Sequence, residues 1–158
     1  MQCSIADACG SMPVALHVAC NVIKHSSTTD AAAVFLRTCC NPHLPFKPHE
    51  VRLPCMVGAV QELMLKAIMA AILMLPEELA TSLFALSLFP GCFSGAAGAE
   101  LLGVTDSGIH RQGLLRKLTR RGLLSYHVHR QLYCMHGVIK AVAVALCKGL
   151  RKLPAPSS

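Results

Sequence analysis

Residues 123–146, LLSYHVHRQLYCMHGVIKAVAVAL, constrain the fold most, because the spacing of their apolar side chains changes within one stretch. Strand-forming side chains with polar interruptions occupy the first half, and apolar residues at helical spacing occupy the second half. The period changes from about two to about 3.6 residues at positions 135–137. This change predicts two short strands around a tight turn, followed by an apolar helix over residues 138–147.

His136 lies at the junction between the predicted ribbon and the predicted helix. A helix start offers unpaired backbone N–H groups and the positive end of the helix dipole. An imidazole at that point, with Gly137 beside it to let a ligand approach, suits a contact with a phosphate. The alternative is that His136 is only a polar cap of the helix.

The rest of the chain is predicted to be mainly α. Residues 41–54 contain four prolines, which cannot sustain a helix, so this stretch is interpreted as a connector. Ser11 and Asp30 are expected to cap the helices that follow them, and Pro13 falls in the first turn of one. Helices are expected over residues 3–10, 13–24, 31–40, 57–75, 76–89 and 94–102, and from 106 or 107 to 121.

These elements indicate a small helical subdomain over residues 1–56, including the connector, and a second unit over residues 57–150. In the second unit, the last three helices are followed by a two-stranded β-ribbon, which is the order of a winged helix. Residues 151–158 are expected to form a disordered tail. The longest apolar run, residues 67–75, is shorter than the roughly 20 residues of a membrane span, which indicates a buried helix and no membrane partner.

The nine cysteines and the N-terminus both indicate a cytoplasmic protein. The N-terminus lacks the pattern of a secretory signal. Most cysteines lie within apolar helical patterns, which suits reduced thiols that fill a core. The spacing in the one cluster rich in cysteine and histidine matches no paired zinc knuckle, so no metal site is predicted. The thiols expected to be reduced are Cys9, Cys20, Cys92, Cys134 and Cys147, and the cluster comprises Cys39, Cys40, His43, His49 and Cys55.

Four stretches together resemble the NB-ARC class of STAND signal-transduction ATPases, which includes plant disease-resistance proteins and apoptotic adaptors. Residues 9–16, CGSMPVAL, resemble the "GLPL" motif, and residues 83–103 resemble the opening of the family's winged helix. Residues 114–124, LLRKLTRRGLL, resemble its "L-x-x-L-x-x-R-x-L-L" helix, and residues 135–137 match two of three positions of its "MHD" motif. The four stretches occur in the family's order and cover most of residues 1–147.

The resemblance implies a nucleotide site shared by both ends of the chain. The family's motif proline packs against adenine, which implies this role for Pro13, with Met12 beside it. The motif histidine contacts the β-phosphate of ADP and holds the resting state, which implies this role for His136. The sequence departs from the motifs at Ser11, and at Gly137, where the family has an acidic residue.

The chain contains no G-x-x-x-x-G-K-[ST] stretch and no apolar strand ending in paired acids. The lysine that neutralises phosphates and the ligands for Mg²⁺ are therefore absent, and no independent ATPase activity is expected. The resemblance implies the C-terminal part of such an ATPase, a regulatory module that binds ADP or ATP weakly by itself. Its expected partner is a P-loop domain or a sibling STAND protein, in an oligomer where the family forms one.

A winged-helix nucleic-acid binder is the alternative. The formal net charge of +7 favours an anionic partner, and Arg116, Lys117 and Arg120 are predicted to lie opposite a leucine stripe on one helix. Only Gln112 on that helix is suited to reading bases, so a solvated basic face, or one that meets an acidic domain, is the competing interpretation.

An enzyme is the third class of protein considered. Cys134 and His136 are two residues apart and would share a face of a strand, but no third group that would orient them is evident in the sequence. Catalysis is therefore not expected.

Overall fold

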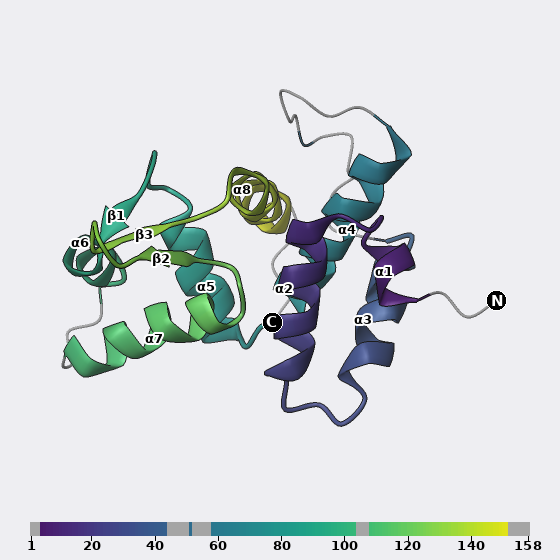
Figure 1. Ribbon diagram of the computed structural model, residues 1–158, viewed down its shortest axis with the longest axis horizontal. Coiled ribbons are helices and arrows are strands. Elements are labelled where there is room, and N and C mark those ends of the chain that lie inside the picture. The colour runs from purple at the N-terminus through teal and green to yellow at the C-terminus, as the bar shows by residue number, and fades with distance from the viewer. Residues whose placement is uncertain (1–3, 44–50, 52–57, 104–107, 152–158) are drawn as a thin grey trace.

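The computed structural model describes residues 4–43, 51, 58–103 and 108–151, and for residues 108–112 and 150–151 it describes the backbone alone. This part of the chain is mainly helical with one small antiparallel sheet, which confirms the predicted fold class (Figure 1). The elements are α1 (Ile5–Ala8), α2 (Pro13–Lys24), α3 (Ala31–Cys39), α4 (Ala59–Leu73), α5 (Glu77–Leu86), β1 (Phe93–Ser94), α6 (Gly95–Leu101), α7 (Gly108–Arg120), β2 (Ser125–His127), β3 (Leu132–Cys134) and α8 (Gly137–Arg151).

The ends of most helices follow from local sequence chemistry, but one of the two predicted caps is wrong. Pro13 occupies the first turn of α2, and the Ser94 hydroxyl accepts the Ala97 N–H at the start of α6. Ser11 does not cap α2, because its φ of 54° belongs to the preceding turn and Met12 is the N-cap residue. Asp30 is the N-cap residue of α3, but its side chain makes no capping hydrogen bond.

Helix α4 lies at the centre of the helical packing. It contacts α2 and α3 on one side and α8 on another. Residues 67–72 are all buried, and six consecutive residues exceed one helical turn, so α4 is covered all round over this stretch. This agrees with the buried helix predicted from the apolar run. Among the described residues, no helix is long and apolar enough to cross a membrane.

The sheet has three strands in the order β1-β3-β2, where the sequence predicted a ribbon of two. β2 and β3 form the predicted antiparallel ribbon, with Tyr126 opposite Tyr133. The additional strand β1 pairs with β3, with Phe93 also opposite Tyr133. The rings of Phe89 and Phe93 stack with centroids 4.6 Å apart. This stack packs the sheet against the segment that follows α5.

Helix α8 lies between the helices packed around α4 and the unit formed by α5, α6, α7 and the sheet. It follows β3 directly and contacts both α4 and α5 (Figure 1). The buried apolar residues form one continuous cluster that includes members of α2, α4, α5, α7 and α8. The predicted boundary between residues 56 and 57 lies outside the described residues. Of the predicted disordered tail at residues 151–158, residues 152–158 also lie outside them, and the prediction is wrong for Arg151, which is the last residue of α8.

Candidate functional site

His136 precedes the first residue of α8 and caps the helix with both its side chain and its backbone. The imidazole Nδ1 accepts the N–H of Val138 at 3.3 Å, and the carbonyl oxygen accepts the N–H of Lys140 at 3.0 Å. The side chain is exposed to solvent. The contacts that His136 makes within the chain are therefore those of a polar helix cap, as the alternative interpretation predicted.

The capping hydrogen bond also determines what the other ring nitrogen can do. A neutral imidazole that accepts a hydrogen bond at Nδ1 carries its proton on Nε2. Nε2 is then a hydrogen-bond donor on an exposed ring, at the positive end of the α8 dipole. Gly137 is exposed as well, and an added Cβ at Gly137 would meet nothing within 4 Å, so the space beside the ring is open.

Pro13 and Met12, the other predicted nucleotide contacts, lie at the start of α2. Pro13 is exposed, and Met12 is half-buried against the hydrophobic core. The exposed pyrrolidine ring can meet a flat apolar partner, whereas the Met12 side chain is partly engaged in the core. Both predicted ends of the nucleotide site, Pro13 and His136, are therefore on accessible surface.

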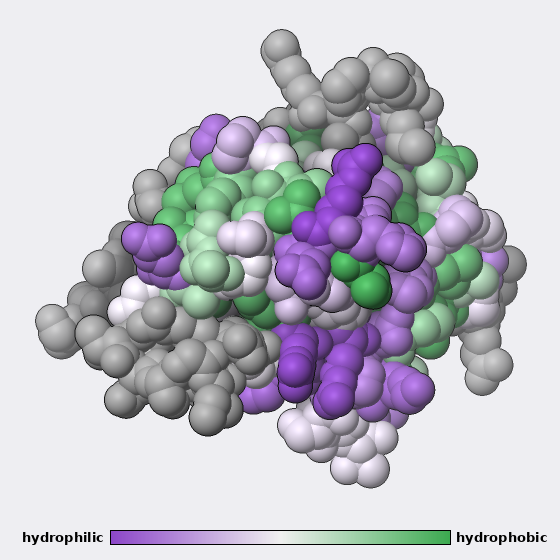
Figure 2. Space-filling model, turned by 60° about the vertical axis from the view of Figure 1, so that its left-hand side comes forward, coloured by the Kyte–Doolittle hydropathy of each residue, from purple (hydrophilic) through white to green (hydrophobic). Residues whose placement is uncertain are grey.

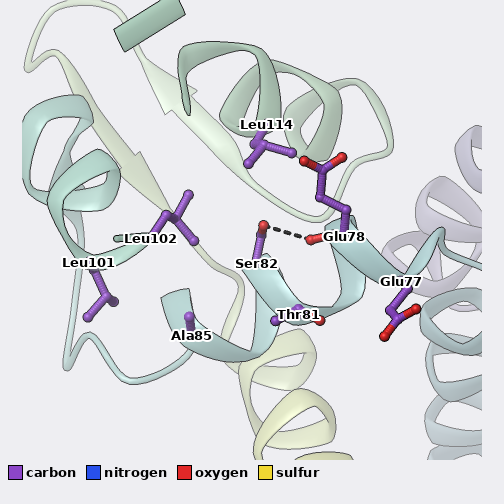
Figure 3. Close-up of a pocket in the computed structure, with 8 residues that line it drawn as sticks. All are labelled: Glu77, Glu78, Thr81, Ser82, Ala85, Leu101, Leu102 and Leu114. Atoms are coloured by element: carbon purple, nitrogen blue, oxygen red, sulfur yellow. Dashed lines mark hydrogen bonds between the residues drawn. The ribbon is translucent and has the colours of Figure 1, made fainter. Parts of the chain in front are cut away.

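We describe two of the hollows in the described part of the chain, and neither is lined by Met12, Pro13 or His136. The first has a volume of about 580 Å³ and lies where α5, α6 and α7 meet (Figure 3). In it, the Ser82 hydroxyl donates to the carbonyl oxygen of Glu78 (Figure 3). The first hollow is lined by Glu77, Glu78, Thr81, Ser82, Ala85, Leu101, Leu102 and Leu114.

The second hollow has a volume of about 440 Å³ and runs along α8 from Gly137, the residue after His136. Its walls are mainly small or apolar side chains, with a lysine at two of its positions. It is lined by Val51, Gly137, Lys140, Ala141, Val144, Ala145 and Lys148. The structure thus does not bring Pro13 and His136 together in either hollow.

Helix α7 separates apolar and basic side chains as predicted. Leu114, Leu115 and Leu118 are buried, and the predicted anion or partner contacts are exposed on the other side: Arg116, Lys117 and Arg120. Figure 2 shows hydrophilic side chains gathered over the central and lower part of the face that contains the sheet and α7. The Gln112 side chain lies outside the described part of the structure.

The prediction that the cysteines are reduced thiols is wrong for two of them. Cys92 and Cys134 form a disulfide bond, so Cys134 is not available as a nucleophile paired with His136. Spacing did not reveal this pair, because its members are 42 residues apart in sequence.

Cys9 is buried, and this burial together with the nearby Cys20 raises the pKa of its thiol to about 11. Within the described ranges, no three His, Cys, Asp or Glu residues are grouped to hold a metal ion, and His49 and Cys55 fall outside those ranges.

Comparison of the chain with known protein families, curated proteins and solved structures finds no match.

Proposed function

We propose that the chain is a nucleotide-sensing regulatory module of the NB-ARC type. In this proposal His136 donates from Nε2 to the terminal phosphate of ADP, and Pro13, with Met12, contacts the adenine. The bulk of the phosphate binding comes from a P-loop domain, in a longer form of the protein or in a sibling STAND protein. The module reports the bound nucleotide and has no ATPase activity of its own, because it lacks the lysine and the Mg²⁺ ligands.

The observation that supports this proposal is the orientation of His136. Its Nδ1 is occupied by the Val138 N–H, which leaves a donor, Nε2–H, at an exposed helix start. The exposed position of Pro13 agrees with a ligand that is held mainly by another domain. The order of the elements from α5 to β3, three helices with a small antiparallel sheet, also agrees with the resemblance.

The test is a titration of the full chain with ADP, followed by the amide resonances in NMR spectra. We expect shifts at residues 136–139 and at Met12 and Val14, which flank Pro13, with a dissociation constant of about 1 mM or weaker, because the phosphate cradle is missing. His136→Asp retains a helix cap but places a negative charge beside the phosphate, so it should abolish the shifts at residues 136–139.

Two control variants distinguish binding at a specific site from a general effect of charge. His129→Asp makes the same charge change at an exposed residue in the turn between β2 and β3, and it should leave ADP binding unchanged. Pro13→Ala should weaken the response to ADP and to adenosine but leave the response to pyrophosphate intact. Equal weakening by His136→Asp and His129→Asp would remove His136 from the site.

The exposed basic face of α7 favours a second candidate function, the binding of duplex nucleic acid. Arg116, Lys117 and Arg120 are all available to phosphates because the helix packs through its leucines. In a plot of the logarithm of the binding constant against the logarithm of the salt concentration, each phosphate contact should change the slope by about −0.9. The test is fluorescence anisotropy with a DNA duplex at several salt concentrations.

In this test the triple variant Arg116→Gln/Lys117→Gln/Arg120→Gln should bind more weakly and with a shallower salt dependence. The pair Lys24→Gln/Arg37→Gln, at exposed positions on α2 and α3, is the matched control. Wild-type binding that is equally weak at all salt concentrations would reject this candidate.

A further inference from the structure

The Cys92–Cys134 disulfide lies where two connecting segments of the fold meet. Cys92 immediately precedes β1, and Cys134 is the last residue of β3, with 4.4 Å between their Cα atoms. Cys92 is exposed and Cys134 is half-buried. A dissolved thiol can therefore reach the sulfur of Cys92 without unfolding of the core.

Noncovalent contacts also hold β1 in place, because Phe93 is buried in the core and its ring stacks on that of Phe89. β1 is only two residues long, and it pairs with β3 through Phe93 and Ser94 alone. The Lys140 ammonium on α8 donates to the carbonyl oxygen of Phe89, and the rings of Phe93 and Tyr133 lie 6.0 Å apart. Because a two-residue strand has little stability of its own, the disulfide adds a covalent restraint on the position of β1 to these noncovalent contacts.

The same disulfide lies next to the helix cap described above. Only Met135 separates Cys134 from His136, whose backbone and ring cap the first turn of α8. Because this separation is short, a change in the freedom of Cys134 can reach the start of α8.

We propose that Cys92 and Cys134 form a reversible redox site, which exchanges with a low-molecular-weight thiol or its disulfide, of the glutathione class. In the oxidised state the disulfide holds the chain before β1 to the end of β3. In the reduced state this link is absent, so the pairing of β1 with β3 and the first turn of α8 open more often. This inference stands independently of nucleotide binding, because it rests on the disulfide and its neighbours alone.

The exchange proceeds in two balanced steps in each direction. In oxidation, the thiolate of the exposed Cys92 attacks one sulfur of the small disulfide, which forms a mixed disulfide and releases one thiolate. The Cys134 thiolate then attacks the Cys92 sulfur, which closes the bond and releases the second thiolate. Overall the two cysteines lose two electrons and two protons, and the small disulfide becomes two thiols. Reduction reverses these steps, with Cys134 as the first leaving thiolate.

The first test equilibrates the full chain, without denaturant, in buffers of different ratios of reduced to oxidised glutathione, followed by alkylation and peptide mass spectrometry. We expect Cys92 and Cys134 to become alkylated together, in a single transition. Two results would contradict the proposal: both residues remaining oxidised in reduced glutathione, or both being alkylated even in oxidised glutathione.

The second test compares amide hydrogen exchange in the oxidised and reduced states. We expect at least about a tenfold increase in exchange at residues 93–94 and 137–139 on reduction, with little change in α4. The variant Cys92→Ser/Cys134→Ser should exchange like the reduced protein in either buffer, and Cys20→Ser, which removes an exposed thiol elsewhere, should respond like the wild type. Unchanged exchange at both segments would overturn the proposal, as would loss of α4 protection, which would make the disulfide a staple of the whole fold.

Discussion

The guanidinium of Arg121 donates a hydrogen bond to the backbone carbonyl of His25, with 3.1 Å between Nη2 and the oxygen, across 96 residues of sequence. Its Nη1 also donates to the carbonyl of Lys117, at 3.3 Å. Arg121 is half-buried, and this burial lowers the pKa of its guanidinium. One side chain thus ties the end of α7 to the end of α2.

Replacing Arg121 by methionine should therefore destabilise the protein. The change removes the charged donor to the His25 carbonyl and one of the two donors to the Lys117 carbonyl. Both hydrogen bonds are exposed to solvent, so we expect a loss of about 0.5–1.5 kcal/mol in the free energy of unfolding by urea. Arg120→Met, at the exposed neighbouring position, is the matched control and should change the free energy by less than about 0.5 kcal/mol. Equal effects of the two variants would show that Arg121 does not join the helices.

Gly122 should tolerate a side chain poorly, for two separable reasons. Its φ is 73°, and an added Cβ would lie 2.6 Å from Cδ2 of His17 on α2. Gly122→Ala should cost about 1–2 kcal/mol of unfolding free energy from the backbone conformation, with an additional cost from the contact with His17. Gly113→Ala, within α7, meets nothing within 4 Å and should be neutral or stabilising.

A double-mutant cycle with His17→Ala separates the two contributions. In that background Gly122→Ala should retain the backbone cost and lose the contact cost. If His17→Ala does not reduce the cost of Gly122→Ala, then α2 does not lie against the turn after α7.

The helices were predictable because their signals are local. The bounds of α2 match the prediction from Pro13 to Lys24, since a proline in the first turn and an apolar face are both visible in the sequence. The start of α8 was marked by the change of period at His136. β1 was missed because two residues are too few to show a period. The predicted cap Ser11 failed because its left-handed backbone conformation depends on the turn that contains it.

The cap at His136 was predictable, but the contacts between segments distant in sequence were not, because they depend on the tertiary structure. The role of His136 as a helix cap could be predicted from its place in the sequence. The Cys92–Cys134 bond, the Arg121–His25 hydrogen bond and the Lys140–Phe89 hydrogen bond each join segments distant in sequence. No spacing rule selects one such pair among nine cysteines or fifteen lysines and arginines.

The raised pKa of Cys9 makes a prediction about alkylation and about pH. At pH 8 the exposed thiol of Cys20 should react with iodoacetamide, while the buried thiol of Cys9 should not react until the protein unfolds. The pKa of the Cys9 thiol in the folded protein, about 11, exceeds its ordinary value of 9.0, so the neutral thiol stabilises the fold below pH 9, and this contribution is lost as pH rises towards 11. Peptide mass spectrometry measures the first effect, and equal rates for the two thiols would contradict it.

The contribution of the His136 cap to the free energy of unfolding can be measured without any ligand. His136→Ala removes the acceptor of the Val138 N–H and should lower the unfolding free energy by about 1 kcal/mol. His136→Asp restores an acceptor and adds a favourable charge at the helix start, so it should be at least as stable as the wild type. An alanine variant as stable as the wild type would show that the ring does not cap α8.

The proposed contact between Nε2 of His136 and a phosphate can be measured by ¹⁵N NMR of the histidine side chains during a titration with ADP. Without ligand, we expect Nδ1 of His136 to be the unprotonated nitrogen and Nε2 to carry the proton. ADP and pyrophosphate should shift the Nε2 resonance, whereas adenosine should not. A His136 ring whose resonances stay fixed with ADP, while other histidines such as His129 respond, would contradict it.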